Sequence, residues 1–244
     1  MIYAIGDVHG QFEMLQDVHA SIEADAAREK IQDYHIVHVG DLTDRGPRSA
    51  EVVEYLASAI AKGAPYTVLK GNHDRMFTTF MDDPHGRDPI LRREYTWLSG
   101  VLGGVETLTS YGVDVQAAAD VDAIHREALL KVPDEHLAFL KGLPSSYQTE
   151  HFFMVHAGIR PGVPLDDQVE DDLIWIRAEF LQSLKQHPKV VIHGHTPEDE
   201  VVHYGNRIGI DTGAAYGGPL SVVVCDGPNV WQLTADGRQA VPRI

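Results

Sequence analysis

The sequence is poor in cysteine, with one, Cys225, among its 244 residues. A single thiol cannot close an internal disulfide, and the apolar run at 220–224 beside it predicts that it is buried. No run approaches the roughly 18 apolar residues of a membrane-spanning helix. The first strand-like residues follow no basic, apolar leader, so we expect no signal peptide. These features predict a reduced, cytoplasmic protein that does not act in a membrane.

Basic residues are also scarce, because 20 lysines and arginines face 36 acids and give a net charge of −16. Nucleic acids and anionic membranes bind to basic surfaces, so neither is expected as a partner. An anionic substrate such as a phosphate compound would be repelled unless cations were held locally. Bound metal ions would supply that positive charge, so an acidic chain of this kind is compatible with a metal-dependent site.

The hydrophobic pattern predicts one mixed α/β domain over residues 1–244, with a helical cap inserted at about 76–145. Early strands alternate with helices, which favours a βαβ beginning with partly parallel strands. The expected early strands are 2–5, 35–39 and 66–69. The cap is expected to contain helices near 90–102, 120–132 and 134–142. Later strands, expected to pair antiparallel around a helix near 172–186, are 152–155, 190–192, 201–204, 207–210, 220–224 and 230–233.

Polar residues follow five of these strands, usually after a glycine. The segments are GDVHG from Gly6, GDLTDRG from Gly40, GNHD from Gly71, HAG from His156 and HGHT from His193. Glycine allows close backbone approach, and ligands bind at the carboxyl edges of open α/β sheets. Each segment alone could be a turn or helix cap, but their joint occurrence favours a site. Its imidazole and oxygen donors, without cysteine, suit two divalent cations such as manganese, iron or zinc.

As a set, the five segments resemble the signature blocks of the phosphoprotein phosphatase family of calcineurin-like metallophosphoesterases. The likeness covers about 7–75 and 155–215. It is greatest for bacterial serine/threonine phosphatases, and bacterial diadenosine tetraphosphatases are similar too. The resemblance implies a mixed β-sandwich flanked by helices, with a helical cap insertion. It also implies two divalent metal ions, with Mn²⁺ preferred and iron or zinc as alternatives.

Carried over to this sequence, the resemblance assigns two overlapping ligand sets. Asp7, His9 and Asp41 would hold the first metal. Asp41 would bridge to the second metal, which is completed by Asn72, His156 and His195. His193, two residues before His195, would lie beside the metals or face the phosphate.

The same resemblance assigns two catalytic residues around a water activated by both metals, and the charge on the phosphate oxygens calls for cations in addition. His73 matches a general acid that protonates the leaving group, and Asp44 matches the carboxylate that orients it. Arg45 would grip two phosphate oxygens. Arg177 is a second candidate cation for the phosphate, although a surface helix position would explain it equally well.

We therefore expect a metal-dependent phosphomonoester hydrolase that acts on phosphoserine or phosphothreonine in proteins or peptides and releases inorganic phosphate. The alternatives are hydrolysis of dinucleoside polyphosphates such as diadenosine tetraphosphate, activity on phosphotyrosine, and an inactive phosphopeptide-binding module. Asp44 favours ester cleavage, because the similar symmetrical tetraphosphatases often lack this acid. The DTGAAYGG segment at 211–218 favours the tetraphosphatases. The sequence does not predict the oligomeric state.

Overall fold

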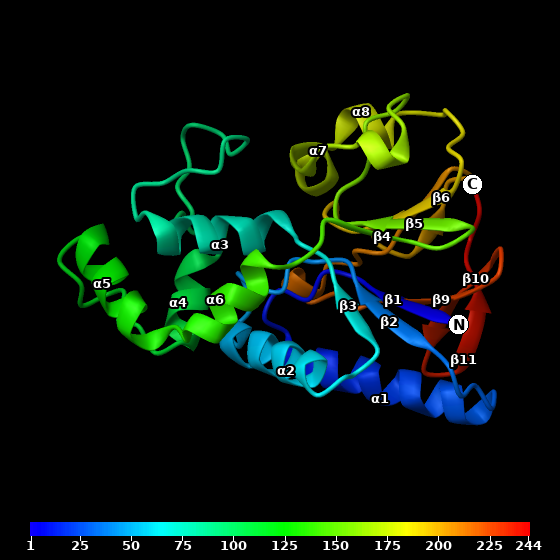
Figure 1. Cartoon of the computed structure of the whole chain (residues 1–244), viewed down its shortest axis with the longest axis horizontal. Coiled ribbons are helices and arrows are strands. Elements are labelled where there is room, and N and C mark those ends of the chain that lie inside the picture. Colours follow the sequence, from blue (N-terminus) through cyan, green and yellow to red (C-terminus); the bar gives the residue numbers. More distant parts are fainter.

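Two β-sheets packed against each other form the centre of the computed structural model, which describes all residues 1–244 (Figure 1). The six-stranded sheet has the order β11-β10-β9-β1-β2-β3, and the five-stranded sheet has the order β4-β5-β6-β8-β7. The first sheet contains β1 (Ile2–Ile5), β2 (His35–His38), β3 (Tyr66–Val68), β9 (Val222–Asp226), β10 (Asn229–Thr234) and β11 (Gly237–Ala240). The second contains β4 (Ser146–Gln148), β5 (Phe152–Val155), β6 (Val190–His193), β7 (Val202–His203) and β8 (Arg207–Gly209).

Helices cover both outer faces of this sandwich and form a lobe beside one end of it (Figure 1). The first sheet is covered by α1 (Phe12–Arg28) and α2 (Ser49–Ala61), and the second by α7 (Glu170–Trp175) and α8 (Ala178–Leu181). The lobe contains α3 (Asn72–Asp82), α4 (Gly104–Ser110), α5 (Val121–Lys131) and α6 (Asp134–Lys141). Short 3₁₀ turns are η1 (Leu165–Asp167) and η2 (Ala214–Tyr216). None of the helices combines the length and apolar character needed to cross a bilayer.

The alternation of side chains along each strand produces this layering. On β5, Phe152 and Met154 point into the core between the two sheets, whereas Phe153 and Val155 point toward α7 and α8. Cys225 lies in the core between the sheets, as predicted, and is 3% exposed. All four residues of β5 are buried, which explains why this strand reads as an unbroken apolar run.

The predicted fold class is confirmed, and β1 and β5 have the predicted bounds. The first three strands are parallel, and β9–β10 and β7–β8 pair antiparallel. The prediction of antiparallel pairing was wrong for β5–β6 and β6–β8, which are parallel. Strands β4 and β11 and the helical character of 72–75 at the start of α3 were not predicted.

Two predicted helices were wrong. Residues 90–102 form turns rather than a helix, and α4 begins only after Gly103, whose φ is +88°. The helix expected at 172–186 is two short helices, because the backbone leaves the helical region at Ile176 and Arg177. The lobe α3–α6 spans residues 72–141, close to the cap expected at about 76–145.

A buried ion pair ties the C-terminal strand β11 to α1 and yields a stability prediction. The Asp25 side chain is fully buried and accepts hydrogen bonds from Arg238 at 2.7 and 3.0 Å and from Tyr3 at 2.8 Å. Burial alone would raise the pKa of Asp25, but these donors hold it below its usual value. Removing Arg238 leaves this buried carboxylate with only Tyr3 and the half-exposed Arg28 as partners, so Arg238→Leu should cost about 3 kcal/mol of unfolding free energy at pH 7.

Urea denaturation measures this loss, with Arg28→Leu as control. Arg28 also contacts Asp25 but is half exposed, so its loss should cost under about 1 kcal/mol. The folded-state pKa of Asp25 is lowered, so the stabilisation is present above its unfolded pKa of about 3.9 and is lost as the pH falls below it. Equal losses in both variants, or a difference that persists in acid, would contradict the role of Arg238.

Candidate metal centre

The residues predicted to bind metals lie in the loops that leave the carboxyl ends of strands from both sheets. Asp7 and His9 follow β1, Asp41 follows β2, and Asn72 begins α3 after β3. His156 follows β5 and His195 follows β6. All six side chains are buried, at 5% exposure or less. The sandwich therefore brings the donors of the first sheet and those of the second to one edge.

Asp41 is the residue shared by two clusters of candidate ligand atoms. One cluster joins it to His9 and His73, and the other joins it to His156 and His195. Within each cluster the donor atoms lie within 4.8 Å of one another. Asp41 Oδ2 lies 3.4 Å from Nε2 of both His9 and His156. This central position is the one that a bridging carboxylate requires.

The hydrogen bonds of His156 are compatible with a cation between these donors. Its Nδ1 lies 3.0 Å from the carbonyl oxygen of Val39, which can only accept, so Nδ1 carries a proton. In the neutral ring Nε2 is then a bare lone pair. It faces Asn72 Oδ1 at 3.0 Å and His195 Nδ1 at 3.2 Å, in addition to Asp41. Lone pairs that converge in this way repel one another unless a positive charge lies among them, which either a proton on His156 or a metal ion can supply.

His9 repeats the arrangement on the other side of Asp41. Its Nδ1 donates to the carbonyl oxygen of Thr43 at 2.8 Å, which leaves Nε2 free to face Asp41 and the Arg45 guanidinium. A backbone carbonyl that fixes the tautomer is the usual support for a metal-binding histidine. The residues present therefore fit divalent cations at both clusters.

Asp7 is held differently. Its Oδ2 accepts the backbone N–H of His195 at 2.9 Å, whereas its buried Oδ1 has no hydrogen-bond partner. Burial raises the pKa of Asp7, and the neighbouring Asp211 carboxylate raises it further. By contrast, although burial lowers the pKa of His156, the Asp41 and Asp7 carboxylates raise it to about 9. The carboxylate contributions to both shifts reflect the close spacing of negative charges at this site.

Two acids at the site were missed in the sequence. Asp211 comes after β8, just as the predicted ligands come after their strands, and this position could have identified it from the sequence. Asp74, the last residue of GNHD, is fully buried and accepts the backbone N–H groups of Gly71 and Leu42, each at 3.0 Å. Asp74 thus fastens the loop after β2 to the start of α3, so that Asp41 and Asn72 stay together.

His73, Asp44 and Arg45 form a second group beside Asp41. His73 Nδ1 donates to Asp44 Oδ2 at 2.6 Å, and Arg45 donates to His73 Nε2 at 3.0 Å. Burial lowers the pKa of His73 to about 3, with Asp41 opposing and Arg45 adding to this shift. Burial also raises the pKa of Asp44 well above its usual range. With Nε2 accepting from Arg45, the ring is neutral in this state, and an anion that engages Arg45 would free that nitrogen.

Arg177 lies at the break between α7 and α8, where it donates to Thr196 at 3.3 Å. Thr196 directly follows His195, so this bond places Arg177 near the second cluster, where its charge, after burial and the His156 charge, lowers the pKa of His195. His193 is not part of this group. It is the last residue of β6, and its ring packs edge-on against Phe180 of α8, with ring centroids 5.1 Å apart.

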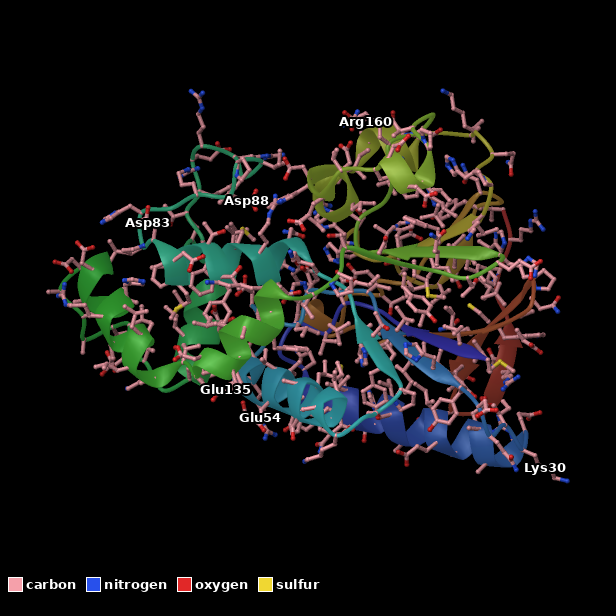
Figure 2. All side chains as sticks on the ribbon, viewed as in Figure 1. Lys30, Glu54, Asp83, Asp88, Glu135 and Arg160 are labelled. Atoms are coloured by element: carbon pink, nitrogen blue, oxygen red, sulfur yellow. The ribbon has the colours of Figure 1, made fainter.

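Two features flank the site. The exposed ring of Tyr216 lies 5.4 Å from the Arg45 guanidinium carbon. On the lobe side, Arg75 of α3 makes two bonds to Asp88, at 2.6 and 3.0 Å, and one to Asp171 of α7 at 2.6 Å. Figure 2 shows Asp88 on the loop that follows α3, toward α7. Arg75 therefore links the lobe to the helix that precedes Arg177.

Comparison with known proteins agrees with this geometry. The profile of the calcineurin-like phosphoesterase family matches residues 1–224. The chain is 27% identical to the asymmetrical bis(5'-nucleosyl)-tetraphosphatase PrpE of Bacillus subtilis, over 76% of this chain and 73% of that protein. It is 24% identical to serine/threonine-protein phosphatase 2 of Escherichia coli, over 90% of each chain.

Solved structures with the same fold include two described by different activities. A putative diadenosine tetraphosphatase superposes with a TM-score of 0.65 and 21% identity, over 95% of this chain and 91% of that one. A point mutant of a cold-active protein tyrosine phosphatase also gives 0.65, with 16% identity, over 98% of this chain and 80% of that one. These similarities establish the fold and leave the substrate open.

The shared position of Asp41 predicts that its carboxylate is needed at both clusters. Asp41→Asn keeps the shape but removes the charge, so affinity for manganese should fall by more than the ~10- to 100-fold that loss of a group hydrogen-bonded to a ligand costs. Elemental analysis of the purified protein and manganese titration followed by thermal unfolding measure the change. Asp226→Asn, an exposed residue of β9, is the control. Retention of two metals per chain by the Asp41 variant would contradict the bridging position.

Proposed function

The chain belongs to the calcineurin-like phosphoesterase family, and on that premise we propose that it hydrolyses phosphoserine and phosphothreonine esters in proteins or peptides and releases inorganic phosphate. The single observation that carries this proposal is the 2.6 Å contact between His73 and Asp44 beside the ligand clusters. An imidazole supported by a carboxylate is what a poor leaving group requires, because a serine or threonine alkoxide must be protonated as it departs.

Members of the family use a dinuclear divalent metal centre. We assign Asp7, His9 and Asp41 to one ion, and Asp41, Asn72, His156 and His195 to the other. The convergent lone pairs and the unpartnered Oδ1 of Asp7 support this assignment. The donor types suit manganese, with iron or zinc as alternatives. When bound, the ions supply Lewis acidity and a water that is nucleophilic at neutral pH.

The remaining roles belong to side chains of this chain. Arg45 offers two guanidinium nitrogens toward the cluster, which suits bidentate contact with phosphate oxygens. Once phosphate engages Arg45, His73 Nε2 is free to take up a proton from solvent, which it would pass to the leaving oxygen as the P–O bond breaks. Asp44 keeps the ring oriented through Nδ1. Arg177 adds a second positive charge near the same cluster.

The second candidate is hydrolysis of dinucleoside polyphosphates. It is supported by the PrpE relatives and by the exposed Tyr216 ring beside Arg45, an aromatic surface that suits a nucleobase. The same ring would also suit phosphotyrosine, the third candidate. The phosphate group expelled from a phosphoanhydride and the phenolate expelled from phosphotyrosine both leave more easily than an alkoxide. Hydrolysis of either substrate therefore depends less on His73. The intact ligand set and the His73–Asp44 pair argue against an inactive phosphopeptide-binding module.

A side-by-side assay of the manganese-loaded protein separates these candidates. The substrates are phosphoserine, phosphothreonine and phosphotyrosine peptides of one sequence, and diadenosine tetraphosphate. We expect kcat/KM to be at least about tenfold higher for the phosphoserine and phosphothreonine peptides, a preference of about 1.4 kcal/mol. Preference for the dinucleotide or phosphotyrosine would establish the second or third candidate. Absence of turnover with metal bound would favour the binding module.

The proton-donor role predicts a dependence on the leaving group. His73→Asn should lower kcat on a phosphoserine peptide by roughly 10²–10⁴-fold, because the alkoxide loses its proton source. The loss on p-nitrophenyl phosphate, whose leaving group needs no proton, should be much smaller. His85→Asn, at an exposed position of the lobe, should leave both activities unchanged. If the His73 variant keeps its metals and loses both activities equally, His73 is not the proton donor.

A further inference from the structure

The lobe reaches back to the catalytic group through two side chains that bond to Asp44. The Trp97 indole N–H donates to Asp44 Oδ2 at 2.8 Å, and the Thr107 hydroxyl donates to Oδ1 at 2.8 Å. The Thr107 hydroxyl also accepts the backbone N–H of Asp44 at 2.8 Å. Both carboxylate oxygens and the amide of Asp44 are therefore held by residues 53 and 63 positions away in the sequence.

The directions of these bonds leave the carboxylate little freedom. An indole N–H can only donate, so Oδ2 must accept from Trp97. The Thr107 hydroxyl already accepts from the Asp44 amide, so its hydrogen is available to Oδ1, with Ser49 more distant at 3.2 Å. Two fixed donors on different oxygens set the plane of the carboxylate. That plane aims Oδ2 at His73 Nδ1, 2.6 Å away.

Trp97 also packs on the helix that carries His73. Its ring stacks on Phe77 at a centroid distance of 5.2 Å and an angle of 19°, and contacts Phe80 at 4.9 Å. Phe77 lies one turn after His73 on α3, on the same side of the helix. Trp97 is 6% exposed. One buried side chain therefore contacts both the helix that orients the imidazole and the carboxylate that bonds to it.

The glycine pair at the start of α4 allows this segment to come so close. Gly103, with φ of +88°, accepts the Arg45 backbone N–H at 3.2 Å, and a Cβ on it would lie 2.1 Å from that nitrogen. A Cβ on Gly104 would lie 2.5 Å from the Trp97 ring. The paired glycines thus permit direct contact between the 97–107 segment and the loop at 44–45.

We propose that Trp97 and Thr107 are positioning residues for proton delivery, holding Asp44 so that His73 stays aimed at the leaving oxygen. This inference rests on the proposed phosphomonoesterase function. It assigns the segment 97–107 a part in the chemistry, whereas a purely structural part would only fasten the lobe to the sandwich. The two roles differ in whether a substitution at Trp97 or Thr107 lowers activity more on substrates with poor leaving groups than on those with good ones.

The test compares kcat on a phosphoserine peptide with kcat on p-nitrophenyl phosphate for Trp97→Phe and Thr107→Val. Each removes one bond to the Asp44 carboxylate and keeps most of the side-chain volume, and Thr107→Val also removes the acceptor of the Asp44 backbone N–H. Loss of one hydrogen bond to a charged group should lower kcat on the peptide about 10- to 100-fold. Activity on the aryl ester should fall by less than about threefold, because proton donation contributes little to its departure. Thr107→Ser restores the hydroxyl and should behave as the unaltered protein.

Ser110→Ala is the matched control on the same face of α4. Ser110 bonds to the backbone of Ala50 at 3.0 Å and does not touch Asp44. Its removal should lower the melting temperature without changing the ratio of the two activities. If Trp97→Phe does not fold, the Thr107→Val and Thr107→Ser pair decides the question alone.

His73→Asn, assayed in parallel, separates failure of this inference from failure of the proposed function. A selective loss in His73→Asn without one in the Trp97 and Thr107 variants would overturn the inference and leave the function standing. Equal losses on both substrates in His73→Asn would remove the proton donor, and the inference with it. Parallel losses on both substrates in Trp97→Phe and Thr107→Val would also overturn it, because that is what a structural role produces.

Discussion

The constraint on which the structure depends is the burial of carboxylates close to one another at the edge shared by the two sheets. Asp7, Asp41 and Asp211 are each 5% exposed or less, and buried charges of one sign are costly unless they are paired. The chain stabilises them mainly with backbone donors. The N–H of His73 bonds to Asp41 at 3.0 Å, and that of His195 bonds to Asp7 at 2.9 Å. These bonds leave other oxygens free to face cations.

Backbone strain is concentrated at the same place. Of the six non-glycine residues with positive φ, five are predicted site residues, and these are His9, Asp41, Asp44, Arg45 and His195. Such conformations cost of order 1–3 kcal/mol each and persist only where the surroundings enforce them. Glycines supply the enforcement by letting loops touch. A Cβ on Gly71 would lie 2.1 Å from the Asp41 carboxylate, and one on Gly194 would lie 1.9 Å from that of Asp7. The motif glycines are therefore needed for contact between loops.

Local pattern predicted the strand ends, because buried strands and the polar residues after them are readable within a few positions. The local pattern could not predict features that depend on contacts between distant parts of the chain. His193 and His195 are two apart, which on a strand would place them on one side, but β6 ends at His193 and His195 adopts a φ of +65° in the loop. The turns at 90–102 likewise follow from the contacts of Trp97 with α3 and Asp44. Nothing local to Trp97 signals a partner 53 residues away.

The sandwich and the lobe consequently contribute different residues to the candidate site. Loops after strands of both sheets carry most of the metal-binding candidates. The proposed proton donor His73 instead lies in the first turn of α3 in the lobe, and its partner Asp44 is held by Trp97 and Thr107. A change in the lobe can then alter proton delivery while the strand ends keep their geometry. Ester cleavage depends on that proton more than anhydride cleavage does. Under the proposed function, the way the lobe holds Asp44 therefore bears on the balance between ester and anhydride cleavage.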